Sequence, residues 1–178
     1  TVKYGNTRDY TEALRVVLAN GEVIETRRLS KRELNKKMGQ SNFEGEVYRA
    51  MDALIEEHKD DLKMLDLGVS KNSAGYCLQQ VKQKGGFDLT PLFVGSQGTL
   101  GIVTEAQFHT EPYNPNTTLI AAFFDDIGTA EQAVMELNRL PDRPSALEVV
   151  DDNLLNLLDQ TNPNQLKGII EKPFSKLI

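Results

Sequence analysis

The chain has 178 residues, a formal net charge of −6, and a composition that is 39% hydrophobic and 26% charged. These values are typical of a globular protein with one ordinary domain or two small ones, and the negative charge argues against a nucleic-acid partner. A lone cysteine, Cys77, excludes an internal disulfide and a thiolate metal cluster, so we expect a reducing, cytoplasmic setting.

The chain opens with neither a Met nor a signal-peptide pattern, so we expect it to be a piece of a longer protein. No apolar run approaches the roughly 20 residues that span a bilayer, so we expect no transmembrane segment. Between residues 27 and 37 lies a basic cluster, which we interpret as a solvated helix face and a hairpin end. Its members are Arg27, Arg28, Lys31, Arg32, Lys36 and Lys37.

The first predicted element is a β-hairpin over residues 14–26. Two apolar runs, "LRVVLA" and "EVIET", flank Asn20 and Gly21. Asn-Gly is the strongest short hairpin signal because both residues tolerate the positive φ of a type I′ turn. We therefore predict that turn here.

Two helices follow. Ser30 and Glu33 have capping-box spacing and Gly39 can end the helix, so we predict a helix over 30–38. Residues 43–62 have apolar side chains at helical spacing, which predicts one amphipathic helix of about five turns. Its buried face is expected to hold Val47, Met51, Leu54, Ile55, His58 and Leu62.

Residues 68–86 are rich in glycine and polar side chains, which predicts a loop with one helical turn near residues 78–81. A strand is predicted over residues 102–108 because apolar and polar residues alternate there. The expected core face of that strand is Ile102, Thr104, Ala106 and Phe108.

"EPYNPN", residues 111–116, is the best domain boundary in the chain because prolines and asparagines fill it. Beyond it we predict strands over 118–124 and 145–150 and a short helix near 153–158. Between the strands we predict a helix capped by Thr129 and Gln132, with Ala130, Ala133, Val134 and Leu137 buried. Strand, helix and strand in this order predict half of a ferredoxin-like α+β layer.

Most chemistry-bearing residues have ordinary structural explanations. His58 and His109 lie far apart in the sequence, and no base stands near Cys77, so we assign none of them to catalysis. The acidic doublets at 60–61, 125–126 and 151–152 are explained by helix caps and solvation. No hydrolase site and no metal site emerge.

The segment "VGSQGTLGIVTEAQF", residues 94–108, carries the most specific signal. Gly95, Gly98 and Gly101 recur every three residues, with hydroxyls at Ser96 and Thr99, directly before the predicted strand. This is neither a P-loop nor a Rossmann turn. Such a loop lets a planar, polar ligand approach the backbone closely, although a tight strand entry would explain the same glycines.

The amino-acid sequences of several segments resemble motifs of one flavoprotein family. "GSQGTLGIVTEAQFHTEP" is similar to the Gly-Ser-Glu-Gly-Thr-Leu-Gly-Ile-x-Thr-Glu-Ala signature of FAD-linked oxidases and dehydrogenases, the family of vanillyl-alcohol oxidase, glycolate oxidase FAD subunits and D-lactate dehydrogenases. "KYGNTRDYTEALRVVLANGEVIET", "KNSAGYCL" and "FDLTPLFVGS" resemble other pieces of it, in family order. "PSALEVVDDNLL" resembles the opening of its cap domain.

The resemblance implies an α+β fold. Residues 1–113 would be the C-terminal part of an FAD-binding domain, namely the second subdomain of a PCMH-type domain. Residues 114–178 would begin a ferredoxin-like cap domain. The family clamps FAD between two subdomains, and the glycine loop approaches it with main-chain groups. Carried over residue by residue, the cofactor-binding candidates are Gly95, Ser96, Gly98, Thr99, Gly101 and Ile102, with Tyr4 and Gly5 at the start of the same subdomain.

The sequence departs from the family pattern at three places. Gln97 stands where the family usually has Glu, and an insertion separates residues 75–76 from residues 87–89. Similar spacing occurs in large fused members, which implies an iron–sulfur cluster elsewhere in the parent protein. The family's first subdomain is absent from this chain, and the cap stops early, so no catalytic residue is assigned.

The resemblance implies a fragment of an FAD-dependent oxidoreductase that oxidises a D-2-hydroxy acid such as glycolate, D-lactate or D-2-hydroxyglutarate. The electron acceptor is left open. The alternative is a non-catalytic binding or structural module that retains the fold of the FAD domain.

Overall fold

The computed structural model describes residues 2–65, 68–69, 72–162 and 164. The chain divides into two compact units, one formed by residues 6–111 and the other by residues 1–5 with 112–178. The described residues mix helices and strands, which confirms the α+β class at this coarse level.

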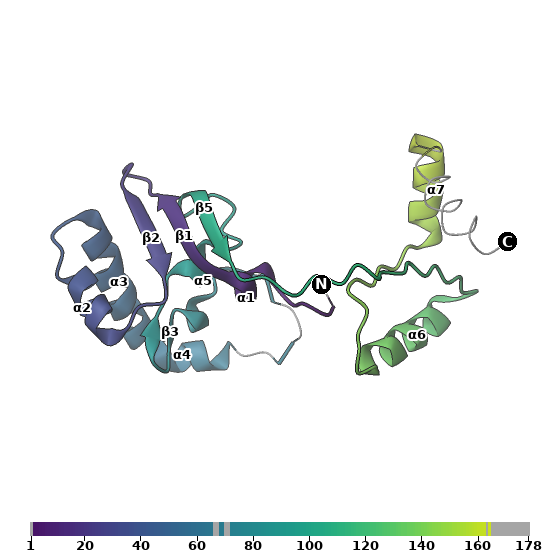
Figure 1. Cartoon of the computed structure of the whole chain (residues 1–178), viewed down its shortest axis with the longest axis horizontal. Helices are drawn as coiled ribbons and strands as arrows, with labels where there is room; N and C mark the ends of the chain where they lie inside the picture. Colours follow the sequence, from purple (N-terminus) through teal and green to yellow (C-terminus); the bar gives the residue numbers. More distant parts are fainter. Residues whose placement is uncertain (1, 66–67, 70–71, 163, 165–178) are drawn as a thin grey trace. The chain divides into compact units, whose positions relative to one another are not determined.

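The unit of residues 6–111 is built on a three-stranded antiparallel sheet. Its strands are β1 (Thr11–Val17), β2 (Val23–Arg27) and β5 (Ile102–Phe108), in the order β2-β1-β5, as Figure 1 shows. A short helix, α1 (Thr7–Tyr10), precedes the sheet. The β1–β2 pair confirms the predicted hairpin, and β5 confirms the predicted strand.

The turn of the hairpin is not the predicted type I′ turn. Gly21 has a φ of 85°, whereas Asn20 is not among the residues with positive φ. The Gly21 amide donates to the Leu18 carbonyl at 2.9 Å, and the Leu18 amide donates to the Glu22 carbonyl at 2.8 Å. This is a three-residue loop in which a tight turn is followed by a left-handed glycine. Because the Asn20 side chain accepts a hydrogen bond from the Glu22 amide at 3.0 Å, Asn20 stabilises the turn without a positive φ of its own.

The helices pack beside the hairpin. α2 (Lys31–Met38) begins with the predicted capping box of Ser30 and Glu33 and ends at Gly39. The predicted five-turn helix is instead two helices, α3 (Phe43–Glu57) and α4 (Lys59–Met64). The break falls at His58, with φ −105° and ψ 20°, at the start of a polar run that has little apolar surface to anchor a continuous helix.

The buried face of α3 also differs from the prediction. Tyr48 is fully buried and Ile55 is buried, whereas Leu54 and His58 are exposed. The other predicted members, Val47, Met51 and Leu62, are partly buried and pack against the core, so the prediction erred at Leu54 and His58 and omitted Tyr48.

The 68–86 segment contains the predicted helical turn as a 3₁₀ helix, η1 (Leu78–Gln80). It also forms part of a small hairpin that the sequence did not predict, β3 (Lys82–Gln83) with β4 (Gly86–Phe87). The Leu29 and Phe87 backbones exchange hydrogen bonds of 2.8 and 3.0 Å, which join this hairpin to the end of β2. A one-turn helix, α5 (Thr90–Phe93), then leads to the glycine loop.

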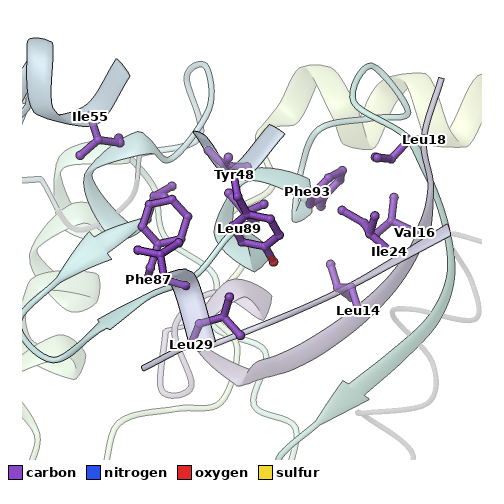
Figure 2. Close-up of a cluster of buried hydrophobic side chains, with 13 residues drawn as sticks. Leu14, Val16, Leu18, Ile24, Leu29, Tyr48, Ile55, Phe87, Leu89 and Phe93 are labelled. Carbon is purple, nitrogen blue, oxygen red and sulfur yellow. The ribbon is translucent and has the colours of Figure 1, made fainter. Parts of the chain in front are cut away.

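One hydrophobic core holds this unit together. Figure 2 shows hairpin side chains such as Leu14, Val16 and Ile24 on one side of the cluster and Leu89 and Phe93 facing them. Further buried members are Leu18, Leu29, Leu34, Tyr48, Ile55, Val81, Phe87 and Leu92. The core thus joins β1 and β2 to segments far away in the sequence.

The predicted core face of β5 is wrong. Every residue of this strand is exposed, including Ile102 and Phe108. The strand is held at the sheet edge by its backbone ladder and by polar cross-strand pairs such as Arg15 with Glu105 at 2.8 Å. The helices and core side chains of this unit cover β1 and β2 instead.

The other unit contains α6 (Ile127–Arg139) and α7 (Asp152–Thr161) within its described residues. The α6 cap is Asp126 rather than Thr129 or Gln132, because the Asp126 carboxylate accepts from the Thr129 amide at 2.9 Å. The predicted buried face of α6 is also wrong, since no residue of this helix is buried.

The two strands predicted after residue 116 are not formed. Residues 118–124 and 145–150 carry no strand in the described structure. A strand exists only where a neighbouring strand accepts its hydrogen bonds, and neither segment has one among the described residues. The short helix near 153–158 is confirmed and is longer than predicted, since α7 covers Asp152–Thr161.

Candidate functional site

The glycine loop, residues 94–101, joins α5 to β5. Three of its residues adopt the left-handed region, with φ values of 89° at Gly95, 52° at Gln97 and 81° at Gly98. Glycine adopts such values without steric cost, whereas Gln97 is the only described non-glycine residue with positive φ. The glycines at positions 95 and 98 therefore allow the backbone of this loop to fold tightly.

The loop is fastened from within by Ser96 and Thr99. The Ser96 amide donates to the Phe93 carbonyl at 3.1 Å, and the Thr99 amide donates to the Ser96 carbonyl at 3.1 Å. The Thr99 hydroxyl donates to the same Ser96 carbonyl at 2.6 Å. Ser96 is itself buried, so its side chain faces the protein rather than solvent.

Gly101 is required for a different reason from Gly95 and Gly98. A Cβ added at Gly101 would lie 2.7 Å from Val16 Cγ1 and 2.8 Å from the Val17 carbonyl oxygen. Both atoms belong to β1. The absence of a side chain at Gly101 is therefore needed for β5 to pair with β1, whatever else contacts the loop.

The other side of the loop is open. A Cβ added at Gly95 or Gly98 would meet no atom within 4 Å in the described structure. The amides of Gln97 and Gly98 donate no hydrogen bond to any described residue. Ile102, the first residue of β5 after the loop, is 67% exposed. Free backbone donors next to an apolar side chain can contact a planar ligand that carries hydrogen-bond acceptors.

A second loop reaches this site, and the sequence did not assign it a role. The Tyr76 hydroxyl lies 2.8 Å from Thr99 Oγ1. Gly75 has a φ of 67°, and the Asn72 side chain accepts from the Ala74 amide at 3.0 Å, so local turns shape this segment. The signal was present in "KNSAGYCL", which was among the segments that resemble the family.

Tyr4 and Gly5, the remaining predicted site residues, belong to the unit of residues 1–5 and 112–178. Gly5 has a φ of 74° and Tyr4 is exposed. Their role in cofactor binding stays a prediction.

The contacts of Cys77, His58 and His109 are those of structural residues rather than of catalytic ones. Cys77 is buried, and burial raises the pKa of its thiol, so it is a poor nucleophile at neutral pH. His109 stacks on Tyr10 with ring centroids 4.5 Å apart, and His58 contacts Asp61 at 3.1 Å. No group of three or more metal-ligating side chains gathers in the part of the chain that the structure describes.

The acidic doublets mainly serve helix termini. Asp126 caps α6, and Asp151 caps α7 by accepting from the Leu154 amide at 2.8 Å. The hydrogen bond from the Thr129 hydroxyl is the main cause of a lowered pKa at Asp126, and the hydrogen bond from the Thr129 amide is the second. Asp60, in the first turn of α4, pairs with Lys63 at 2.7 Å. These contacts agree with the capping interpretation drawn from the sequence.

The chain is similar to curated oxidases and dehydrogenases of 2-hydroxy acids. It is 31% identical over 158 residues to the glycolate oxidase subunit GlcD of Bacillus subtilis, covering 89% of this chain and 23% of that protein. It is 34% identical over 94 residues to the mitochondrial D-lactate dehydrogenase [cytochrome] 1 of Saccharomyces cerevisiae, covering 52% of this chain and 16% of the relative. It is 27% identical over 157 residues to the D-2-hydroxyglutarate dehydrogenase of Escherichia coli, covering 86% and 15%.

These relatives confirm the family resemblance drawn from the glycine loop and its neighbouring segments. The chain spans less than a quarter of the length of each of them. No family model and no solved structure matches it. Among the described residues, no helix is both long enough and apolar enough to cross a membrane.

Proposed function

Because the chain is similar to glycolate oxidase, D-lactate dehydrogenase and D-2-hydroxyglutarate dehydrogenase, we propose that it is the part of an FAD-linked flavoprotein that supplies one wall of the FAD site. In that family FAD supplies the redox chemistry, acceptance of a hydride from the substrate. The contribution of this chain is to bind and orient the cofactor with backbone groups.

One observation supports this proposal most directly: the glycine loop has open space around Gly95 and Gly98 and free backbone donors at Gln97 and Gly98. The amides of Gln97 and Gly98 have no partner among the described residues, and the space beside Gly95 and Gly98 is empty of side chains. A flat, acceptor-rich ring system fits such a surface. Ile102 adds apolar contact at its edge.

The predicted site residues then divide into two groups. Gly95, Gly98 and Ile102 present surface to the cofactor. Ser96, Thr99 and Gly101 shape the loop, because Ser96 is buried, Thr99 bonds to it, and Gly101 packs on β1. Tyr4 and Gly5 stay candidates from the preceding segment.

The finer domain assignment is also part of the proposal. Residues 1–113 would form the second subdomain of a PCMH-type FAD-binding domain, and residues 114–178 would begin a ferredoxin-like cap. The exposed strand β5 and the exposed apolar residues of 118–124 support this assignment, because both segments have surface left to pair or pack. The relatives include proteins named as mitochondrial, so the expected cytoplasmic location stays a prediction.

For the whole protein we propose oxidation of a D-2-hydroxy acid. The names of the relatives support this class, since they specify glycolate, D-lactate and D-2-hydroxyglutarate. Nothing in these names or in the described residues supports the iron–sulfur cluster, so FAD is the one cofactor that we carry forward.

The test uses the full-length protein that contains this chain. We expect the purified protein to show a flavin absorption spectrum. Anaerobic mixing with D-lactate, glycolate or D-2-hydroxyglutarate should bleach the flavin with at least one of them, and a dye or quinone should then reoxidise it where NAD does not. A colourless protein that binds no added FAD would favour the non-catalytic alternative. A yellow protein bleached only by a sugar or a phenol would leave FAD in place and refute the hydroxy acid.

A matched pair of variants tests the loop itself. Gly98→Val places a side chain on the open face, and we expect the full-length protein to lose its flavin while it stays folded. Gly21→Val has a similar φ, 85°, at an open hairpin turn, and serves as the control for backbone strain. Equal flavin content in both variants would show that the open face does not contact FAD.

A further inference from the structure

Tyr76 and Thr99 form a directed chain of hydrogen bonds that ends at the glycine loop. Thr99 has one hydroxyl proton, and the Ser96 carbonyl, an acceptor only, lies 2.6 Å away. That proton is therefore engaged. The Tyr76 hydroxyl, 2.8 Å from Thr99 Oγ1, must be the donor of the second bond. The order is Tyr76 to Thr99 to Ser96.

This chain fixes the part of the loop that faces the open side. The Ser96 carbonyl accepts from both the Thr99 amide and the Thr99 hydroxyl, and these two bonds close the turn around Gln97 and Gly98. The turn contains the two free amides, and its central residues Gln97 and Gly98 are both left-handed. Holding Thr99 in one rotamer therefore holds the donors in one orientation.

Tyr76 is not part of the hydrophobic core. The residue is 44% exposed, and the core cluster includes other aromatic residues, Tyr48, Phe87 and Phe93. The hydroxyl of Tyr76 is thus joined to the site and not to the packing that stabilises the fold. An exposed aromatic ring whose hydroxyl is bonded to the open loop is available to a ligand at that surface.

We propose that Tyr76 is a positioning residue for the FAD-binding face of the glycine loop. The inference rests on the proposed function. By donating to Thr99, Tyr76 pre-orders the Ser96–Thr99 turn, so the free amides of Gln97 and Gly98 meet the cofactor without a further loss of backbone entropy. The same hydrogen bond also connects the segment of residues 72–77, which carries Tyr76, to the glycine loop.

The experiment measures FAD affinity of the full-length protein after removal of the flavin and its readdition. Tyr76→Phe removes only the hydroxyl, and we expect the dissociation constant for FAD to rise about five-fold, the effect of one hydrogen bond. Tyr113→Phe, at a tyrosine that is 88% exposed, is the matched control and should leave the affinity unchanged. The melting temperature of the FAD-free protein should be the same for all three forms.

A double-mutant cycle separates a direct connection from an indirect one. Thr99→Val removes the acceptor of the Tyr76 hydroxyl, so Tyr76→Phe should have no further effect on FAD affinity in that background. Thr99→Ser keeps the hydroxyl and should restore most of the affinity that Thr99→Val loses.

The outcomes are distinguishable. A flavin-containing protein in which Tyr76→Phe binds FAD as tightly as the wild type would overturn this inference and leave the proposed function intact. Additive effects in the cycle, or a lower melting temperature of FAD-free Tyr76→Phe, would also overturn it by assigning Tyr76 a structural role. A wild-type protein that binds no FAD would refute the proposed function itself, and the inference with it.

Discussion

The glycines of the loop between α5 and β5 are required for two different physical reasons. Gly98 has a φ of 81° and open space around it, whereas Gly101 packs against Val16 and Val17. Replacing Gly101 by Ala should lower the free energy of unfolding by about 1–3 kcal/mol, because the added methyl overpacks the β1–β5 contact. Replacing Gly98 by Ala should cost about 1 kcal/mol, from backbone strain alone.

Chemical denaturation of the two alanine variants checks this difference. If Gly98→Ala is the more destabilised, the assignment of the two causes is reversed. The distinction was not predictable from the sequence, where both glycines had the same cofactor-facing role. The atoms that exclude a side chain at Gly101 lie some 85 residues earlier in the chain, and only the fold brings them there.

Tyr48 presents a second case at the scale of the residue. Its ring is fully buried, and its hydroxyl has no hydrogen-bond partner in the described structure. A buried unpaired hydroxyl is destabilising, so Tyr48→Phe should raise the free energy of unfolding by about 1 kcal/mol. Tyr48→Leu, which also removes the aromatic contact with Phe87, should lower it instead. Thermal denaturation of both variants is the measurement, and a destabilised Tyr48→Phe would mean that the hydroxyl is hydrogen-bonded in solution.

At the scale of the element, α2 shows how a local signal becomes a measurable pH dependence. Hydrogen bonding to the Arg27 side chain, then to the Ser30 amide and hydroxyl, lowers the pKa of Glu33 from 4.5 to about 2. A folded-state pKa below the unfolded value means that ionised Glu33 stabilises the fold above about pH 4.5, and that this contribution is lost as the pH falls towards 2.

The expected result is a wild-type melting temperature above that of Glu33→Gln at pH 6. The difference between the two proteins should shrink steadily from about pH 4.5 to about pH 2. Arg27→Gln removes the largest cause of the lowered pKa, so in that background the Glu33→Gln difference should be smaller at pH 6 and disappear at a higher pH. A difference that is independent of pH would contradict the assignment.

Elements with strong local signals were predictable, whereas the burial of their faces depends on distant partners and was not. The capping box of α2 and the β1–β2 hairpin involve residues within about 15 positions of one another, and both were predicted. The alternation in β5 predicted a strand, but it could not tell that the apolar face would be uncovered. The segment 118–124 has strand-like composition and no partner strand among the described residues, so composition alone gave the wrong element there.

At the scale of the whole molecule, packing is concentrated in one of the two units. Among the described residues, all the buried hydrophobic side chains lie between Leu14 and Phe93, within the unit of residues 6–111. Several large apolar side chains of the other unit are exposed, including Leu119, Ile120 and Phe123.

This division predicts the course of limited proteolysis of the 178-residue chain. Residues 112–124 are exposed and lack regular secondary structure, so they should be cleaved first. Chymotrypsin should cut after Tyr113, Phe123 or Phe124, whereas Tyr48, Phe87 and Phe93 should be protected by burial.

We expect a stable product that contains residues 6–111, identified by its mass. Its far-ultraviolet circular dichroism should retain the cooperative thermal transition of the parent chain, because the core remains complete. Early cleavage within residues 6–65, or a product that unfolds without a cooperative transition, would mean that the two units depend on each other for stability.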